Sequence, residues 1–128
     1  VRLRLNNVEG KVYNEERVRH QYRLSRAGWI GDYLDPHAFL EVYLSGGGQN
    51  VTSWANPEYD RLVRASRGTR EAGARRELYR RAEEILLRDL PVIPLFWDAK
   101  SHLVHPAVHG RHTNLLDYHP CNRVWLQP

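Results

Sequence analysis

The chain has 128 residues, of which 41% are hydrophobic and 27% charged, a size and balance typical of one globular domain. The formal net charge of +4 comes from arginines spread along the chain, so it permits an anionic partner without requiring one. The single cysteine, Cys121, excludes a disulfide within the chain, and no apolar run reaches the roughly 20 residues of a membrane-spanning helix. The chain begins at Val1, without a signal peptide, and contains no methionine, which predicts that an N-terminal part is missing.

The first third of the chain is predicted to combine strands with one short helix. Alternating apolar and charged residues predict a half-buried strand over Val1–Leu5, and Gln21–Ile30 has similar strand character. Apolar residues at helical spacing predict a short helix over Val8–Val18. A second helix is predicted over Pro36–Ser45, because its apolar residues form one stripe and three glycines follow it.

The second half of the chain is predicted to begin with two helices and to end with short strands. Asn56 followed by Pro57 predicts the start of a helix over Pro57–Ser66. Thr69 is predicted to cap the longest helix, Arg70–Leu90. Apolar composition after Pro91 predicts three strands, over Val92–Trp97, His102–Val104 and Arg123–Leu126.

The longest predicted helix carries a face rich in charged residues. Acidic residues precede basic ones by four positions, an order that favours ion pairs within a helix. The predicted pairs are Glu71 with Arg75, Glu77 with Arg81, and Glu84 with Arg88. A face paired in this way is typical of a solvated helix, whereas a nucleic-acid surface needs unpaired cations and interleaved aromatic residues.

The run Gly28–Pro36 places two carboxylates at the junction between the predicted strands and helices. Asp35 precedes Pro36, a combination typical of a helix cap followed by the first helical residue. Asp32 has no such local role and lies beside Trp29 and Tyr33, so its carboxylate requires a cation. That cation is either an arginine of this chain, which the sequence slightly favours, or a positively charged ligand.

The sequence contains no pattern that predicts catalysis, a cofactor or a metal. No serine lies in a nucleophile elbow, and the three glycines at Gly46–Gly48 are not followed by the residues of a phosphate-binding loop. Five histidines crowd the last third of the chain without the spacing of a known metal motif. They are His102, His105, His109, His112 and His119. The chain is therefore predicted not to be an enzyme, and no metal ligand is assigned.

From Gly28 onward the chain resembles the family 5 extracellular solute-binding proteins, the peptide-binding subunits of bacterial ABC importers. The matching motifs occur in the family's order and extend over nearly the whole chain. They are Gly28-Trp29-x-x-Asp32-Tyr33-x-Asp35-Pro36, Phe39-Leu40, Asn50, Trp54, Asn56-Pro57-x-Tyr59-Asp60, Arg76-x-Leu78-Tyr79, Ala82-Glu83-x-Ile85-Leu86, Asp89-x-Pro91-Val92-Ile93-Pro94-Leu95 and Leu103-Val104-x-Pro106-x-Val108-x-Gly110.

The resemblance implies an α/β protein with part of a type II periplasmic-binding-protein fold, helix-rich and with a few strands. Members of the family are several times longer, so the chain is expected to be a C-terminal portion. Residues 1–97 are expected to form part of the second ligand-binding lobe, and residues 98–128 a tail that returns to the first lobe. The resemblance also implies a periplasmic or extracellular location, possible lipid anchoring, and ABC permease subunits as partners.

The resemblance implies a peptide ligand and assigns roles to the junction. Asp32 is expected to pair with the α-ammonium group of the peptide, an interaction strengthened by charge. Backbone groups at Gly28 and Ile30 are expected to bind the peptide as an added strand, and Trp29 to form the wall of a side-chain pocket.

The same resemblance places two arginines near the carboxylate end of the peptide. Arg26 and Arg17 match these positions by their spacing from Trp29, although they fit surface cations or partners of Asp32 equally well. The motifs do not choose among oligopeptides, dipeptides, nickel chelates, haem and sugars as ligands.

Two rival hypotheses remain open at this stage. One is a separate basic protein that binds nucleic acid, and the other is a histidine-rich metal-binding fragment in which His105 takes part. Peptide binding without nucleic acid is the interpretation that the ordered motifs favour.

Overall fold

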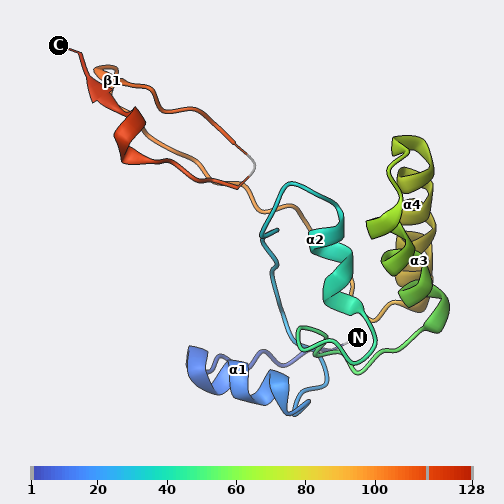
Figure 1. The fold of residues 1–128 in the computed structure, drawn as a ribbon. Helices are drawn as coiled ribbons and strands as arrows, with labels where there is room; N and C mark the ends of the chain where they lie inside the picture. Colours follow the sequence, from blue (N-terminus) through green and yellow to red (C-terminus); the bar gives the residue numbers. More distant parts are fainter. Residues whose placement is uncertain (1, 115, 128) are drawn as a thin grey trace.

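The computed structural model describes residues 2–114 and 116–127 and is helix-rich, with two very short strands (Figure 1). The elements in chain order are α1 (Gly10–Val18), α2 (His37–Leu40), the 3₁₀ helix η1 (Glu41–Tyr43), α3 (Pro57–Gly68), α4 (Ala72–Asp89), β1 (Val108–His109), the 3₁₀ helix η2 (Cys121–Arg123) and β2 (Trp125–Leu126). No helix in these described ranges is both long and apolar enough to cross a membrane.

Helices α3 and α4 form a hairpin that packs against α2 and contains the main core (Figure 1). Tyr59, Leu62 and Val63 on α3 are fully buried. The core is completed by Leu40, Ala82 and Leu86, with partly buried residues such as Trp54 and Val92 at its edge. The Tyr59 hydroxyl donates to the Leu40 carbonyl at 2.6 Å, which satisfies the polar end of this buried ring.

The start of α3 confirms the sequence prediction, whereas the start of α4 corrects it. The Asn56 side chain accepts hydrogen bonds from the Glu58 and Tyr59 amides, at 3.1 and 3.2 Å. At α4 it is Glu71, not Thr69, that accepts from the first-turn amides. The Thr69 hydroxyl instead donates to a carbonyl of α3, so it stabilises the end of the preceding helix.

The ion pairs on α4 differ from those predicted. Arg80, three residues after Glu77 and four before Glu84, pairs with both of these carboxylates. Arg81 reaches across the hairpin to Glu58 at 3.2 Å. The carboxylates on α4 thus pair with an arginine three or four residues away, whereas Arg81, the predicted partner of Glu77, binds a carboxylate of α3 instead.

Four predicted strands are absent from the described residues. The segments 2–5, 21–30, 92–97 and 102–104 contain no strand, and Val1 lies outside the described residues. A strand is stabilised by a pairing partner, and within the described ranges these segments have none. The predicted helix over Pro36–Ser45 is also shorter, because α2 ends at Leu40 and continues only as η1.

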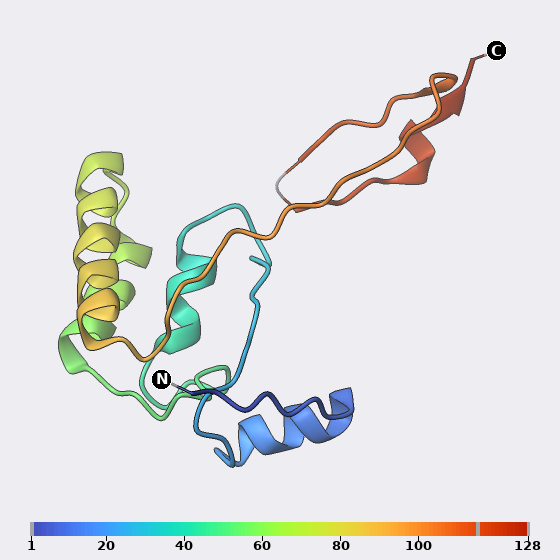
Figure 2. The ribbon, with the colours of Figure 1, turned by 180° about the vertical axis from the view of Figure 1, so that it is seen from behind.

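The strand predicted over Arg123–Leu126 is confirmed in its second half, Trp125–Leu126. Strands β1 and β2 pair antiparallel, with Val108 opposite Leu126 and His109 opposite Trp125. They close an arm, defined here as residues 98–127, that projects from the helical part in both views (Figures 1 and 2). Gly110 has φ of 79°, and a Cβ there would lie 1.9 Å from the Arg123 carbonyl, so glycine is required at this turn.

Candidate functional site

The segment Gly28–Asp32 lies before α2 and is held by two aromatic side chains. The Trp29 indole donates from Nε1 to the Ala38 carbonyl at 2.8 Å. The Phe39 ring lies against Gly31, where an added Cβ would come within 2.9 Å of the ring. These contacts fix the path of an otherwise irregular segment and leave the Ile30 side chain exposed.

The backbone of this segment is open for pairing. No backbone hydrogen bond of Gly28, Trp29 or Ile30 occurs within residues 2–114 and 116–127. Apart from Gly28 and its two neighbours in the chain, no atom lies within 4 Å of the position of a Cβ on Gly28, so the space beside the backbone is open. An exposed row of unpaired N–H and C=O groups is the feature to which an extended peptide can add as a strand.

Asp32 is exposed and has no cationic partner in the described part of the chain. Arg26 and Arg17, the internal partners considered for it, form no ion pair within the described ranges. Arg75 pairs with Asp35, three residues further on, at 2.7 Å. Of the two alternatives for Asp32, an internal arginine is therefore not the one found in this structure.

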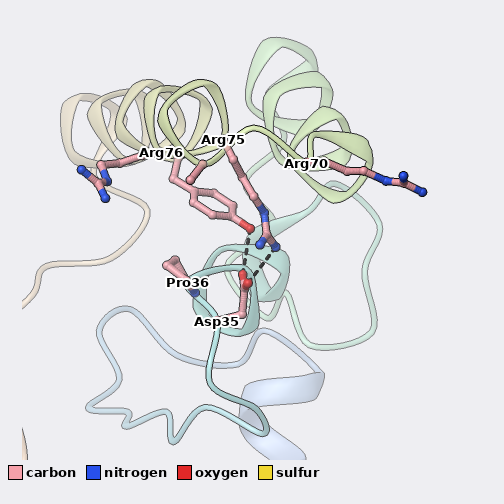
Figure 3. Close-up of a pocket in the computed structure, with 7 residues that line it drawn as sticks. Asp35, Pro36, Arg70, Arg75 and Arg76 are labelled. Carbon is pink, nitrogen blue, oxygen red and sulfur yellow. Dashed lines mark hydrogen bonds and ion pairs between the residues drawn. The ribbon is translucent and has the colours of Figure 1, made fainter.

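Asp35 has a structural role at the floor of a shallow pocket of about 250 Å³ (Figure 3). It accepts a hydrogen bond from the His37 amide at 2.8 Å, as predicted for a residue that caps α2. The Tyr79 hydroxyl and the Arg75 guanidinium also bind its carboxylate, at 2.8 and 2.7 Å. Burial alone would raise the pKa of Asp35, but the His37 amide, Tyr79 and Arg75 together lower it, so the carboxylate stays ionised.

Tyr33 connects the segment to the side of α2. Its hydroxyl lies 2.7 Å from His37 Nδ1 and donates to Glu41 at 2.5 Å. Partial burial and the Glu41 carboxylate raise the pKa of Tyr33 to about 12, so the hydroxyl remains a donor at neutral pH. This network fixes the residue next to Asp32 without engaging the Asp32 carboxylate.

Tyr13 on α1 contacts the backbone of Arg26 and the side chain of Arg17, a link that was not predicted from the sequence. The Tyr13 hydroxyl donates to the Arg26 carbonyl at 2.5 Å, and the Arg17 guanidinium lies 5.2 Å from the centre of the Tyr13 ring. Neither arginine forms an ion pair within the described ranges, and Arg26 is exposed. The helical spacing of Tyr13 and Arg17 was the available signal for this contact.

The chain is similar to known peptide-binding proteins in both sequence and structure. No family model matches the chain. The chain is 37% identical over 108 residues to the periplasmic oligopeptide-binding protein OppA of Haemophilus influenzae, and 34% identical over 110 residues to the dipeptide-binding protein DppE of Bacillus subtilis. The H. influenzae OppA complex with the peptide RPPGFSPFR superposes on 96% of the chain, with a TM-score of 0.84 at 33% identity. This chain is homologous to part of a family 5 solute-binding protein.

The match to the family 5 proteins covers most of this chain but a small part of each relative. It includes 84% and 86% of the chain and 20% of each of the two curated relatives, so the chain spans about a fifth of their length. The unliganded murein tripeptide-binding protein MppA matches with a TM-score of 0.78 at 28% identity and has 24% of its chain covered. The expectation of a partial, helix-rich portion of the type II binding-protein fold is thus confirmed.

Proposed function

We propose that the chain supplies one wall of the peptide-binding cleft of a solute-binding subunit that serves an ABC importer. The observation that carries this proposal is the combination of a free carboxylate on Asp32 with an unpaired backbone at Gly28–Ile30. A peptide has a complementary set of groups, an α-ammonium at one end followed by regularly spaced N–H and C=O groups.

Each residue of the segment has a role in this proposal. Asp32 binds the α-ammonium through a hydrogen bond strengthened by charge, once the opposing lobe excludes water. The backbone at Gly28 and Ile30 pairs with the peptide main chain, a mode that tolerates many side chains. Trp29, held to α2 by its indole nitrogen, forms the wall of a side-chain pocket.

The arginines at the other end of the segment bind the peptide carboxylate. Arg26 carries an exposed guanidinium, and its backbone is tied to α1 through Tyr13. Arg17 lies on the same helix as Tyr13, beside the ring. Arginine side chains form strong hydrogen bonds with carboxylates, so these two residues suit an anionic peptide end.

The rest of the chain is assigned from the family relationship. Residues 1–97 belong to one lobe of the cleft, and residues 98–128 reach the other lobe, in keeping with the projecting arm (Figure 1). The protein works by binding rather than catalysis, since its relatives are binding proteins, and it acts outside the cytoplasmic membrane with permease subunits as partners.

The nucleic-acid alternative is less well supported by the helical surface. Arg61, Arg80, Arg81 and Arg88 on α3 and α4 each contact a carboxylate. These pairs reduce the free positive charge on the face that would have to bind phosphates.

The proposal is tested in a protein that provides both lobes. The matched segment of H. influenzae OppA is replaced by this chain, and binding of RPPGFSPFR to the chimera is measured by calorimetry. Asp32→Asn is expected to weaken binding by about 2 kcal/mol or more, roughly thirtyfold in Kd, because a buried ammonium loses its counter-charge. The N-acetylated peptide, which lacks the ammonium, is expected to bind the two proteins equally.

Asp98→Asn is the matched control, since Asp98 is also exposed and lies outside the segment. It is expected to leave the Kd unchanged. If Asp32→Asn weakened the binding of both peptides equally, the carboxylate would stabilise the conformation of the segment and would not bind the ammonium group. If neither peptide responded, the role proposed for Asp32 would be wrong.

A further inference from the structure

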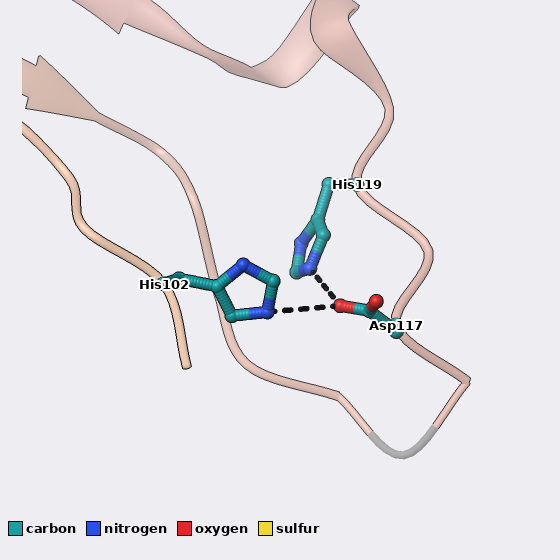
Figure 4. Close-up of side chains that lie close together, drawn as sticks. All are labelled: His102, Asp117 and His119. Atoms are coloured by element: carbon teal, nitrogen blue, oxygen red, sulfur yellow. Dashed lines mark hydrogen bonds and ion pairs between the residues drawn. The ribbon is translucent and has the colours of Figure 1, made fainter. Parts of the chain in front are cut away.

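A cluster of metal-binding side chains lies in the arm, away from the segment Gly28–Asp32. His102 comes from the outgoing leg of the arm, while Asp117 and His119 come from the returning leg (Figure 4). One ligand atom from each side chain lies within 4.8 Å of the other two. Residues separated by 15 and 17 positions in the sequence are thus brought to one point, which the spacing of the histidines did not predict.

The geometry is close to that of a zinc site with three protein ligands. Asp117 Oδ1 lies 3.3 Å from His102 Nε2 and 2.8 Å from His119 Nε2. Ligand atoms at about 2.0–2.1 Å from a tetrahedral ion are roughly 3.3 Å apart. The His102–Asp117 distance matches this spacing, whereas His119 lies closer to Asp117 and has to move outward to admit an ion; both rings already point toward the same oxygen (Figure 4).

The Asp117 carboxylate is oriented with one oxygen toward the two imidazoles. Lys100 binds its other oxygen, Oδ2, at 2.5 Å and leaves Oδ1 facing the two imidazoles.

The remaining histidines of the arm do not converge on this point. His105 Nδ1 accepts a hydrogen bond from the Ala107 amide at 3.2 Å. The His109 ring stacks on Trp125 across the β1–β2 pair. His112 is exposed and lies outside the cluster, which makes it the natural control.

We propose that His102, Asp117 and His119 form a binding site for Zn²⁺, with water completing the coordination. Two imidazoles and a carboxylate are the donors of open zinc sites, and imidazole suits zinc better than the hard cations Mg²⁺ and Ca²⁺. The ion would join the two legs of the arm and so stabilise it against opening. This site is independent of the peptide-binding segment, and its failure would leave the proposed function untouched.

Arg111 competes with the ion and provides a sensitive test. Its guanidinium lies 3.1 Å from His119 Nε2, the atom that would bind zinc. Binding of Zn²⁺ must displace this cation, so removing its charge tightens the site. Arg111→Gln is therefore expected to lower the Kd for zinc, an effect that a purely structural role of the cluster would not produce.

The test is a calorimetric titration of the full 128-residue chain, free of affinity tag and treated with chelator, with ZnCl₂ at pH 7.5. One ion per chain is expected to bind. His102→Ala, Asp117→Asn and His119→Ala are each expected to raise the Kd by more than about tenfold, since even changes around the ligands cause losses of 10–100-fold in metal sites. His112→Ala is expected to leave the Kd unchanged.

Histidine-ring NMR of the unsubstituted chain makes the result independent of how the variants fold. Zinc is expected to shift the ring signals of His102 and His119 at one equivalent and to leave the His112 signal in place. Absence of uptake would overturn the proposal, as would uptake that His112→Ala weakens as much as His102→Ala does.

Discussion

The helical unit formed by residues 35–92 and the arm formed by residues 98–127 use their apolar side chains in opposite ways. In the helical unit, Tyr59, Leu62 and Val63 are fully buried, while in the arm Leu103 is 104% and Tyr118 72% exposed. The helical unit thus buries a core of apolar side chains within the chain. In the arm the apolar side chains face outward, which is typical of a segment that packs against another part of a larger protein.

The sharpest way to test this contrast is the same substitution in both regions. Leu62→Ala is expected to lower the free energy of unfolding by about 2–5 kcal/mol, because it leaves a cavity in a fully buried core. Leu103→Ala removes the same atoms from a fully exposed position, and it is expected to change the free energy of unfolding by less than about 0.5 kcal/mol. Urea unfolding followed by circular dichroism measures both.

If both leucine substitutions lowered the free energy of unfolding equally, the arm would fold onto the helical unit in solution. In that case the contrast between the regions would belong to this conformation alone. A loss confined to Leu62 would establish the hairpin of α3 and α4 as the part that carries the stability of the chain.

The same contrast explains how much of the fold the sequence could predict. Helices α1, α3 and α4 were predicted within a few residues, because apolar spacing and caps such as Asn56 are local signals. The predicted strands at 21–30 and 92–97 were wrong in this structure, because a strand also needs a partner, and local pattern does not supply one. The arginine partners were mispredicted for a related reason, since Arg81 binds Glu58 across the hairpin.

The sequence predicted which residues belong to the candidate site, but not which ion pairs they form. The motif around Asp32 and Asp35 identified both carboxylates, and the proline after Asp35 correctly indicated a cap. Nothing in the local sequence showed that Arg75, 40 residues away, would bind Asp35 and leave Asp32 free. The cluster of His102, Asp117 and His119 was likewise hidden, because it depends on how the two legs of the arm are aligned.

The two carboxylates give a second, smaller contrast between a satisfied and a free residue. Asp35→Asn keeps an acceptor for the His37 amide but loses the charge that pairs with Arg75. It is expected to lower the free energy of unfolding at pH 7 by about 1–2 kcal/mol, a modest value because Arg75 is a third exposed. Asp32→Asn is expected to have no effect on stability, because no partner is lost.

The pH dependence of the Asp35 effect follows from the direction of its shift. The pKa of Asp35 is lower in the folded chain, so its ionised form stabilises the fold above the unfolded pKa of about 3.9. That stabilisation is lost as the pH falls through the folded pKa. The difference between the wild type and Asp35→Asn should therefore shrink below about pH 4, and a constant difference from pH 7 to pH 2.5 would contradict the role of charge.

The smallest expected effect distinguishes the predicted cap of α4 from the observed one. The Glu71 carboxylate accepts from the Ala74 and Gly73 amides, and these two bonds lower its pKa. Glu71→Ala is expected to reduce thermal stability at pH 7, whereas Thr69→Val removes only one hydroxyl bond, to the end of α3. Because the pKa of Glu71 is lowered in the folded chain, its ionised carboxylate stabilises the fold above the unfolded pKa of about 4.3. The loss of stability caused by Glu71→Ala should therefore shrink as the pH falls below that value. The loss caused by Thr69→Val should not depend on pH. Thermal melts at pH 7 and pH 3 compare them, and a larger, pH-independent loss for Thr69→Val would restore Thr69 as the cap.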